Sequence, residues 1–171
     1  YYLKTLEDVG KSDETMVERA RALHSLAHIE RKMNTPEKAL AHFEEAVPVF
    51  EAVLERGGLD EEEGYDVRMR LADSLENAAS LSENPVDHAA LILLTKSMGH
   101  FEHLYQLNPN DDEVMTRAAS TSFLLGRAYA AHRQHAAAVT AFSRAADLAA
   151  FLRDKSPDAS MALTELIGQL Q

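Results

Sequence analysis

One stretch of the sequence decides the fold: Leu125-Gly126-Arg127-Ala128-Tyr129-Ala130, followed by Ala138, Ala141-Phe142 and Ala145. Its apolar residues recur every three or four positions on both sides of a short polar turn, which is the spacing of two amphipathic helices. A glycine midway along the first helix lets the second helix come close, and the alanines and phenylalanine of the second helix fill the groove. The stretch therefore predicts an antiparallel helix pair in which the second helix comes close to the first at Gly126.

The same spacing occurs twice more, earlier in the chain. Ala27 and Ala78 take the place of Gly126, so the repeat steps are 51 residues (27 to 78) and 48 residues (78 to 126). The middle copy departs most, because Asn77 and Ser97 stand where the other copies have Leu and Ala. The matching residues, copy by copy, are Met16, Ala27, Ala39, Phe43 and Ala46; Val67, Ala78, Ala90, Leu94 and Ser97; and Met115, Gly126, Ala138, Phe142 and Ala145.

Clusters of proline, glycine and asparagine separate the periodic segments, and no segment alternates with the period of a strand. We therefore predict an all-α chain of three long antiparallel helix pairs over 13–57, 61–108 and 111–155. Residues 1–12 are predicted to be a linker or partial helix, and 156–171 a capping helix or the start of a truncated fourth pair. The later helices are expected over 65–81, 86–107, 113–132, 135–153 and 159–170.

Three details of packing can be predicted as well. Pro48 is expected to bend its helix, because proline removes one backbone hydrogen bond. Residues 101–107 are expected to be mostly core, through Phe101, Leu104, Tyr105 and Leu107. The first helix is expected to present one apolar face, made of Met16, Ala20, Leu23, Ala27 and Ile29.

The repeated pattern resembles the tetratricopeptide repeat family. Residues 125–130 with Ala138, Phe142 and Ala145 match it best, and Leu107-Asn108-Pro109-Asn110 is similar to its end-of-repeat turn. The family's unit is about 34 residues, whereas this period is longer and is similar to the extended repeats of bacterial signalling proteins, including those attached to serine/threonine kinases. The resemblance implies a right-handed solenoid and a non-enzymatic scaffold that binds a protein or peptide within a larger protein. The alternative is a sensor or dimerisation region that controls another output domain.

In the family, the first helix of each pair lines the concave groove. In the first unit, basic and imidazole side chains share one helix stripe, so they are candidates for binding an acidic peptide or a terminal carboxylate. The alternative is an ordinary solvated helix face, balanced by Glu18 and Glu30. The candidate partner-binding residues are Arg21, His24, His28, Arg31, Lys32, Ser120, Phe123 and Arg127.

Eight histidines raise the question of a metal site. His24 and His28 have the helical spacing that can chelate one ion, and His100 with His103 is a looser pair. Such pairs are common on helices without an ion, so we predict no metal and no cofactor. The acidic run at 60–63 is expected to complement a helix dipole, and no nucleophile or phosphate-loop motif is found. We therefore predict no catalytic residue; a metal-binding or enzymatic helical protein is the third alternative.

Composition limits the kinds of partner and site that the chain can have. The net charge of −11 argues against a nucleic-acid partner, because binding along phosphates needs many Lys and Arg contacts. The absence of cysteine excludes disulfides and thiolate metal sites. No apolar run reaches the roughly 20 residues of a membrane span. The compartment stays open between cytoplasmic and extracytoplasmic, and a homodimer is a possible assembly.

Overall fold

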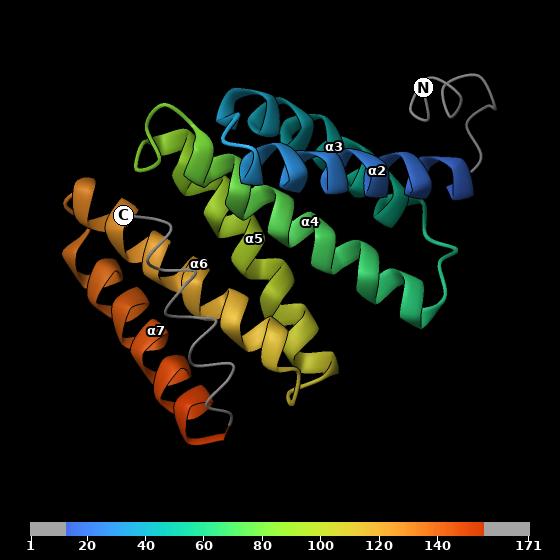
Figure 1. The fold of residues 1–171 in the computed structure, drawn as a ribbon. Coiled ribbons are helices and arrows are strands. Elements are labelled where there is room, and N and C mark those ends of the chain that lie inside the picture. Colours follow the sequence, from blue (N-terminus) through green and yellow to red (C-terminus); the bar gives the residue numbers. More distant parts are fainter. Residues whose placement is uncertain (1–12, 156–171) are drawn as a thin grey trace. The chain divides into compact units, whose positions relative to one another are not determined.

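Six helices make up the part of the chain that the computed structural model describes, residues 13–155. No strand occurs between these residues, so the all-α prediction is confirmed for them. The predicted linker at 1–12 and the predicted helix at 159–170 lie outside the described residues. The helices are α2 (Asp13–Lys32), α3 (Pro36–Arg56), α4 (Glu61–Leu81), α5 (His88–Leu107), α6 (Asp112–Ala131) and α7 (His135–Lys155) (Figure 1).

The helix ends follow local capping chemistry. Asp87 precedes α5 and its carboxylate accepts a hydrogen bond from the Ala90 backbone N–H at 2.8 Å. Asp111 does the same for α6, toward the backbone N–H groups of Glu113 and Val114. Such caps satisfy N–H groups that have no partner within the helix. For this reason α5 begins at His88, two residues later than predicted.

The start of α4 differs from the prediction by four residues. The helix was predicted from Tyr65, and the acidic run before it was expected to complement the helix dipole. Glu61, Glu62 and Glu63 form the first turn of α4, where they do so. Asp60 caps this turn, since its carboxylate accepts from the Glu63 N–H at 2.8 Å. Carboxylates are stabilised at this end by the helix dipole. Glu61–Glu63 therefore belong to the helix rather than to the loop before it.

The chain divides into two compact units, one ending at Leu81 and the other beginning at Ser82. Unit 1 contains α2, α3 and α4, and unit 2 contains α5, α6 and α7. The predicted second helix pair, 61–108, spans this division. The arrangement of three pairs in one right-handed solenoid therefore stays a prediction.

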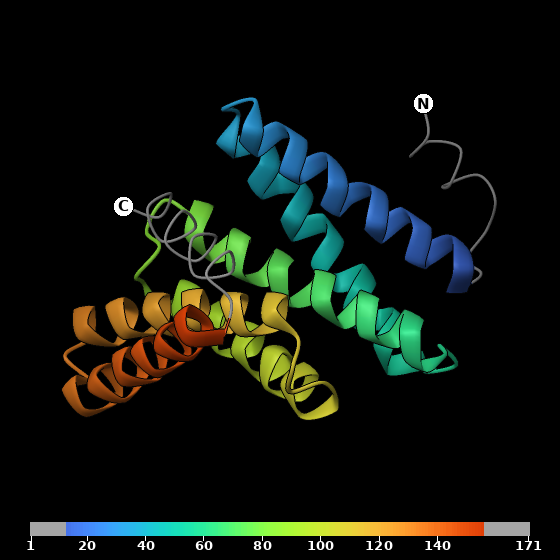
Figure 2. The ribbon, with the colours of Figure 1, turned by 60° about the horizontal axis from the view of Figure 1, so that its bottom comes forward.

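In unit 1, α3 packs against both α2 and α4, and α2 also contacts α4. Figure 1 and Figure 2 show α2 and α4 running in the same direction, with α3 running opposite to them. Ile29 was predicted to lie in the apolar face, but it is 54% exposed, and Val17 is buried instead. The helix α3 continues through Pro48. Of the repeat positions in the first copy, Ala27, Ala39, Phe43 and Ala46 are confirmed as fully buried, whereas Met16 is half-buried.

In unit 2, α6 packs against both α5 and α7, and α7 runs alongside α6 (Figures 1 and 2). The predicted close contact is confirmed: a Cβ atom added at Gly126 would lie 2.5 Å from the ring of Phe142. Any larger side chain would therefore displace that ring. Of the expected core residues on α5, Phe101 and Leu104 are buried, whereas Tyr105 and Leu107 are exposed.

Candidate functional site

Four of the predicted groove residues on α2 face α4. Arg21 Nε donates to Asp66 Oδ2 at 3.0 Å, and Arg31 Nη1 donates to Asn77 Oδ1. Between them, the His28 imidazole lies 2.6 Å from Asp73 Oδ2. These three contacts join residues 45 or 46 positions apart, and His24, one turn before His28, reaches the same Asp73 from 49 positions away, as expected for two parallel helices. We call this set the α2/α4 seam, and it comprises Arg21, His24, His28 and Arg31 on α2 and Asp66, Asp73 and Asn77 on α4.

At one end of the seam, the Arg21 guanidinium is surrounded by carboxylates. Besides Asp66, it contacts Glu18 at 2.9 Å and Glu63 at 3.8 Å. Burial by itself lowers the pKa of Arg21, but its hydrogen bonds to Glu18 and Asp66 outweigh this, so the pKa stands above its ordinary value. The charge of Arg21 is therefore already compensated within unit 1.

An acidic hollow of about 640 Å³ opens at this end. The sequence predicted a basic groove, but the lining here has four carboxyl side chains against two guanidinium groups. Arg70 is not a free cation either, because its Nε donates to both oxygens of Asp66. The hollow therefore does not offer unmatched positive charge to an acidic peptide. Its lining residues are Arg21, Asp60, Glu62, Glu63, Asp66 and Arg70.

At the centre of the seam, two imidazoles converge on one carboxylate. His24 Nε2 lies 2.9 Å and His28 Nε2 lies 2.6 Å from Asp73 Oδ2, and the two Nε2 atoms are 3.2 Å apart. The side chains of His24 and Asp73 are 11% and 14% exposed, whereas that of His28 is 34% exposed. Phe43 packs edge-on against both imidazoles, with ring centroids 6.1 Å from His24 and 5.1 Å from His28. The cluster thus has an apolar floor and one side open to solvent.

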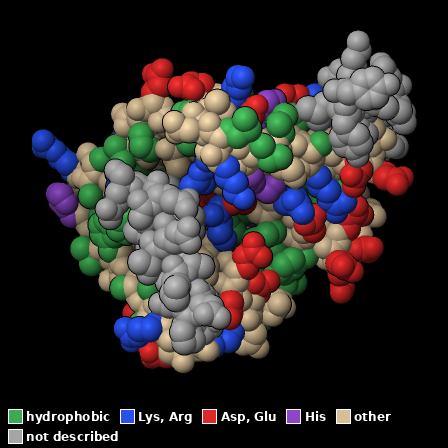
Figure 3. Space-filling model, viewed as in Figure 1, with side chains coloured by type: hydrophobic (Ala, Val, Ile, Leu, Met, Phe, Trp, Pro, Cys, Tyr) green, Lys and Arg blue, Asp and Glu red, His purple; other side chains and the backbone are tan. Residues whose placement is uncertain are grey.

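At the other end, Asn77 links the two helices. Its side chain accepts from Arg31 and also donates from Nδ2 to the Asp73 backbone oxygen at 2.8 Å. This explains why the middle repeat departs from Leu at this position: a buried amide satisfies groups on both helices. Lys32, also predicted in the groove, lies exposed in the last turn of α2. Figure 3 shows Lys, Arg and His side chains over α2 and α4, with Asp and Glu side chains beside them.

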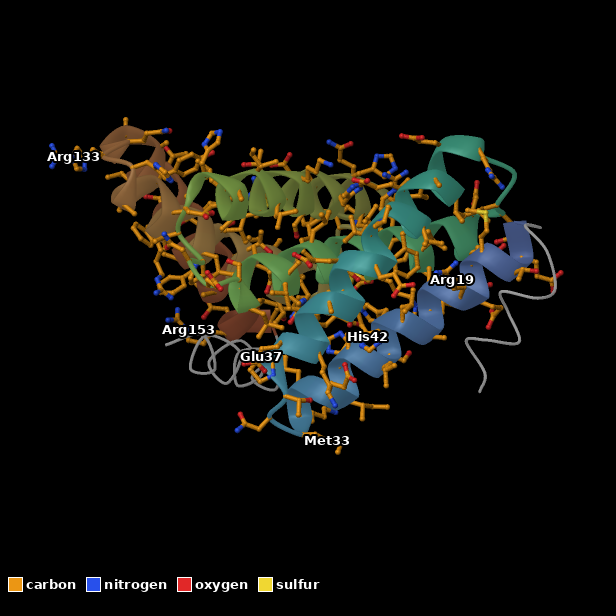
Figure 4. All side chains as sticks on the ribbon, turned by 90° about the horizontal axis from the view of Figure 1, so that it is seen from above. Arg19, Met33, Glu37, His42, Arg133 and Arg153 are labelled. Carbon is orange, nitrogen blue, oxygen red and sulfur yellow. The ribbon has the colours of Figure 1, made fainter. Side chains whose placement is uncertain are left out.

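Other charged groups of unit 1 form isolated pairs between α2 and α3. His42 Nδ1 lies 2.7 Å from Glu30 Oε2, and Arg19 Nη2 lies 2.6 Å from Glu45 Oε1. Figure 4 labels Arg19 and His42 on these helices. Each of these pairs joins two side chains, whereas the His24, His28 and Asp73 cluster joins three.

The three predicted groove residues of unit 2 lie on α6 and differ in exposure. Ser120 is fully buried, so it has no surface with which to contact a partner. Phe123 is half-buried and packs against Phe142, with ring centroids 5.8 Å apart. Arg127 is half-buried. That the α2 and α6 residues share one groove stays a prediction.

Unit 2 has a second surface that was not predicted from the sequence, an apolar groove of about 580 Å³. Two of its apolar side chains are well exposed, Tyr105 at 43% and Val139 at 65%. Tyr105 was predicted to be core, and the signal that could have placed Val139 outside is its position off the alanine stripe of α7. We call this surface the α5/α7 groove; its lining is Phe101 and Tyr105 from α5, Ala118 from α6, and Val139, Thr140, Ser143, Arg144, Asp147 and Leu148 from α7.

Comparison with models of known protein families gave no match, and no curated protein matches the sequence. Among residues 13–155, no helix combines the length and the apolar character needed to cross a membrane.

Proposed function

We propose that the chain is a non-enzymatic protein-binding module of helical-repeat type, and that unit 2 binds its partner through the α5/α7 groove. The observation that carries this proposal is the exposure of Tyr105 and Val139 beside a hollow large enough for several side chains. Exposed apolar surface next to a groove is the usual mark of a protein-interaction site.

The groove suits an amphipathic helix of a partner protein. Its floor and walls come from three helices, and α5 alone, at 20 residues, is about 30 Å long. A partner helix can place residues three and four positions apart into such a groove. Each square ångström of apolar surface that the partner covers contributes roughly 25 cal/mol to the free energy of binding. The entropic and desolvation costs of association reduce this gain.

The rim of the groove is polar and carries both charge signs. Arg144 on α7 is paired with Glu102 on α5, and Asp147 lies one helical turn further along α7. Thr140 and Ser143 add hydroxyl groups that can hydrogen-bond to a partner. An apolar centre with a polar rim is the common anatomy of protein interfaces.

The resemblance of residues 125–145 to tetratricopeptide repeats supports the same function, since that family serves as protein-binding scaffolds. The proposal assigns no reaction to the chain. It also places the chain within a larger bacterial signalling or regulatory protein, as the long repeat period suggests.

Site-specific photocrosslinking in the source cells tests the proposal. A photoreactive phenylalanine analogue replaces Tyr105 or Val139, and a matched control replaces the exposed Glu44 on α3. The expected result is a discrete crosslinked product from both groove positions and none from the control. Crosslinking that is absent, or equal at all three positions, would contradict the proposal.

The mass of the product separates a foreign partner from a second copy of this chain. A partner then purified is expected to bind the Val139→Asp variant at least about tenfold more weakly, because the buried carboxylate would lose its hydration. A product at twice the chain mass, with a dimer in light scattering that Val139→Asp dissolves, would show self-association instead.

A further inference from the structure

We propose that His24, His28 and Asp73 form a binding site for one divalent transition-metal ion such as Zn²⁺. Among residues 13–155 they are the one group of three potential ligands whose donor atoms all lie within 4.8 Å of one another. Two imidazoles with one carboxylate are a donor set suited to Zn²⁺, Co²⁺ or Ni²⁺. The proposal is independent of the α5/α7 groove.

The separations of the donor atoms fit a single ion. The two Nε2 atoms are 3.2 Å apart, and Asp73 Oδ2 lies 2.9 Å from one and 2.6 Å from the other. Zinc bonds of about 2.0–2.2 Å place tetrahedral ligands roughly 3.3 Å apart. Asp73 Oδ2 would therefore have to move about 0.4 Å further from the His24 nitrogen and about 0.7 Å further from the His28 nitrogen for an ion to lie between the three atoms.

Hydrogen bonding alone does not satisfy the three contacts. With Asp73 ionised, its carboxylate only accepts, and each imidazole Nε2 carries at most one proton. If both protons point to Asp73 Oδ2, the contact between the two Nε2 atoms has none. A cation at the centre attracts all three donor atoms at once. In the hydrogen-bonded arrangement, no proton lies between the two Nε2 atoms.

The fold positions the ligands in advance. His24 and His28 are one helical turn apart, so their side chains project from the same face of α2. Asp73 comes from the facing helix α4, where the Asn77 side chain also donates a hydrogen bond to the Asp73 backbone oxygen. The Phe43 ring lies against both imidazoles and limits their rotation. Such supporting contacts orient metal ligands and raise affinity.

The site would keep open coordination positions. Three protein ligands leave a fourth position for water or for an atom of a bound partner. The exposure of His28 shows the direction from which that ligand can enter, since its side chain is 34% accessible and those of His24 and Asp73 are much less so.

The test is titration of Zn²⁺ into the chelator-treated, untagged chain, measured by isothermal calorimetry. The variants are His28→Gln and Asp73→Asn, and the matched control is His42→Gln, which removes a histidine paired with the carboxylate of Glu30 alone. We expect one Zn²⁺ per chain, binding at least about tenfold weaker in the first two variants, and unchanged binding in the control.

A second readout guards against variants that fail to fold. Co²⁺ bound to the wild-type chain gives a visible spectrum whose intensity reports the coordination number, and His28 is exposed enough to be replaced without unfolding α2. Circular dichroism of the metal-free variants checks their folding. A wild-type chain that binds no ion, or equal binding by His28→Gln and His42→Gln, would overturn the proposal.

Discussion

The helices α2 and α6 occupy the same place in the repeat, 99 residues apart (27 to 126), and yet use it differently. Both packing positions are closely packed, since Ala27 is fully buried and Gly126 lies directly against the Phe142 ring of α7. Beside it, His24 of α2 corresponds to Phe123 of α6. His24 faces a carboxylate on α4 at 2.9 Å, whereas Phe123 packs on an aromatic ring. The repeat thus fixes where helices touch and leaves the neighbouring positions free for specific chemistry.

The second helices differ in the same way. Phe43 is fully buried in unit 1, whereas its counterpart Phe142 is 36% exposed in unit 2. The same sequence pattern therefore gives a closed pair in one unit and a partly open one in the other. Alanine substitutions at the two positions measure this difference.

The largest expected effect is that of Phe43→Ala, which should lower the free energy of unfolding by about 3–5 kcal/mol through loss of burial and a cavity. Phe142→Ala should cost less, about 1–2 kcal/mol, because part of the ring is already in water. Urea unfolding, with hydrogen exchange assigned to each unit, measures both. Equal costs would show that the two pairs are equally closed.

Next in size is Gly126→Val, which should destabilise unit 2 by about 1–3 kcal/mol through overpacking against Phe142. The control is the same substitution in the Phe142→Ala background, where the ring is absent and most of the cost should disappear. This double-mutant cycle isolates the contact. A cost that persists without the ring would show that the close approach involves other atoms.

Asp73→Ala should destabilise metal-free unit 1 by about 1–3 kcal/mol, because it leaves two partly buried imidazoles without their acceptor. Asp87, an N-cap of α5, offers a comparison of a different kind, since its loss should cost about 1 kcal/mol in unit 2. Thermal unfolding of both variants without metal checks the order. If Asp73→Ala leaves the stability unchanged, the cluster contributes little to the free energy of unfolding unless an ion is bound.

The smallest effect is expected for Arg21→Ala, within about 1 kcal/mol, since the guanidinium is 28% exposed and its ion pairs are screened by salt. Because the pKa of Arg21 is raised, the side chain stays charged throughout the range in which the protein is studied, and its contribution should not change between neutral and mildly alkaline pH. Unfolding at low and high salt is the measurement. A salt-independent loss would point to packing of the arginine stem.

Much of the fold could be predicted from the sequence, because local signals determine helices. Hydrophobic spacing and turn residues predicted most helix ends to within two residues. The predicted helix at 65–81 began four residues late, because Glu61–Glu63 add no apolar position to the hydrophobic spacing. The small residue at 126 was predicted to let the second helix approach at close range, and the Phe142 ring beside it confirms this.

Only the α2 side of the candidate site could be predicted. The stripe on α2 follows from helical spacing, but its partners Asp66, Asp73 and Asn77 lie about 45 residues away on α4, and no local pattern identifies them. Glu18 was expected to balance the basic stripe in the alternative reading and does pair with Arg21, but the α4 carboxylates that also compensate it were not foreseen. The α5/α7 groove was missed because helical spacing does not distinguish a packed apolar residue such as Phe101 from an exposed one such as Tyr105.

The central claim is that equivalent repeat positions carry different chemistry in the two units, with a metal-binding cluster in unit 1. Nuclear magnetic resonance of the isotopically labelled chain, with and without one equivalent of Zn²⁺, tests it most directly. The account predicts shifts at the imidazole nitrogens of His24 and His28 and at nearby amides of α2 and α4, with the resonances of α6 unchanged. Shifts centred on other histidines, such as His132 or His135, or no shifts at all, would contradict it.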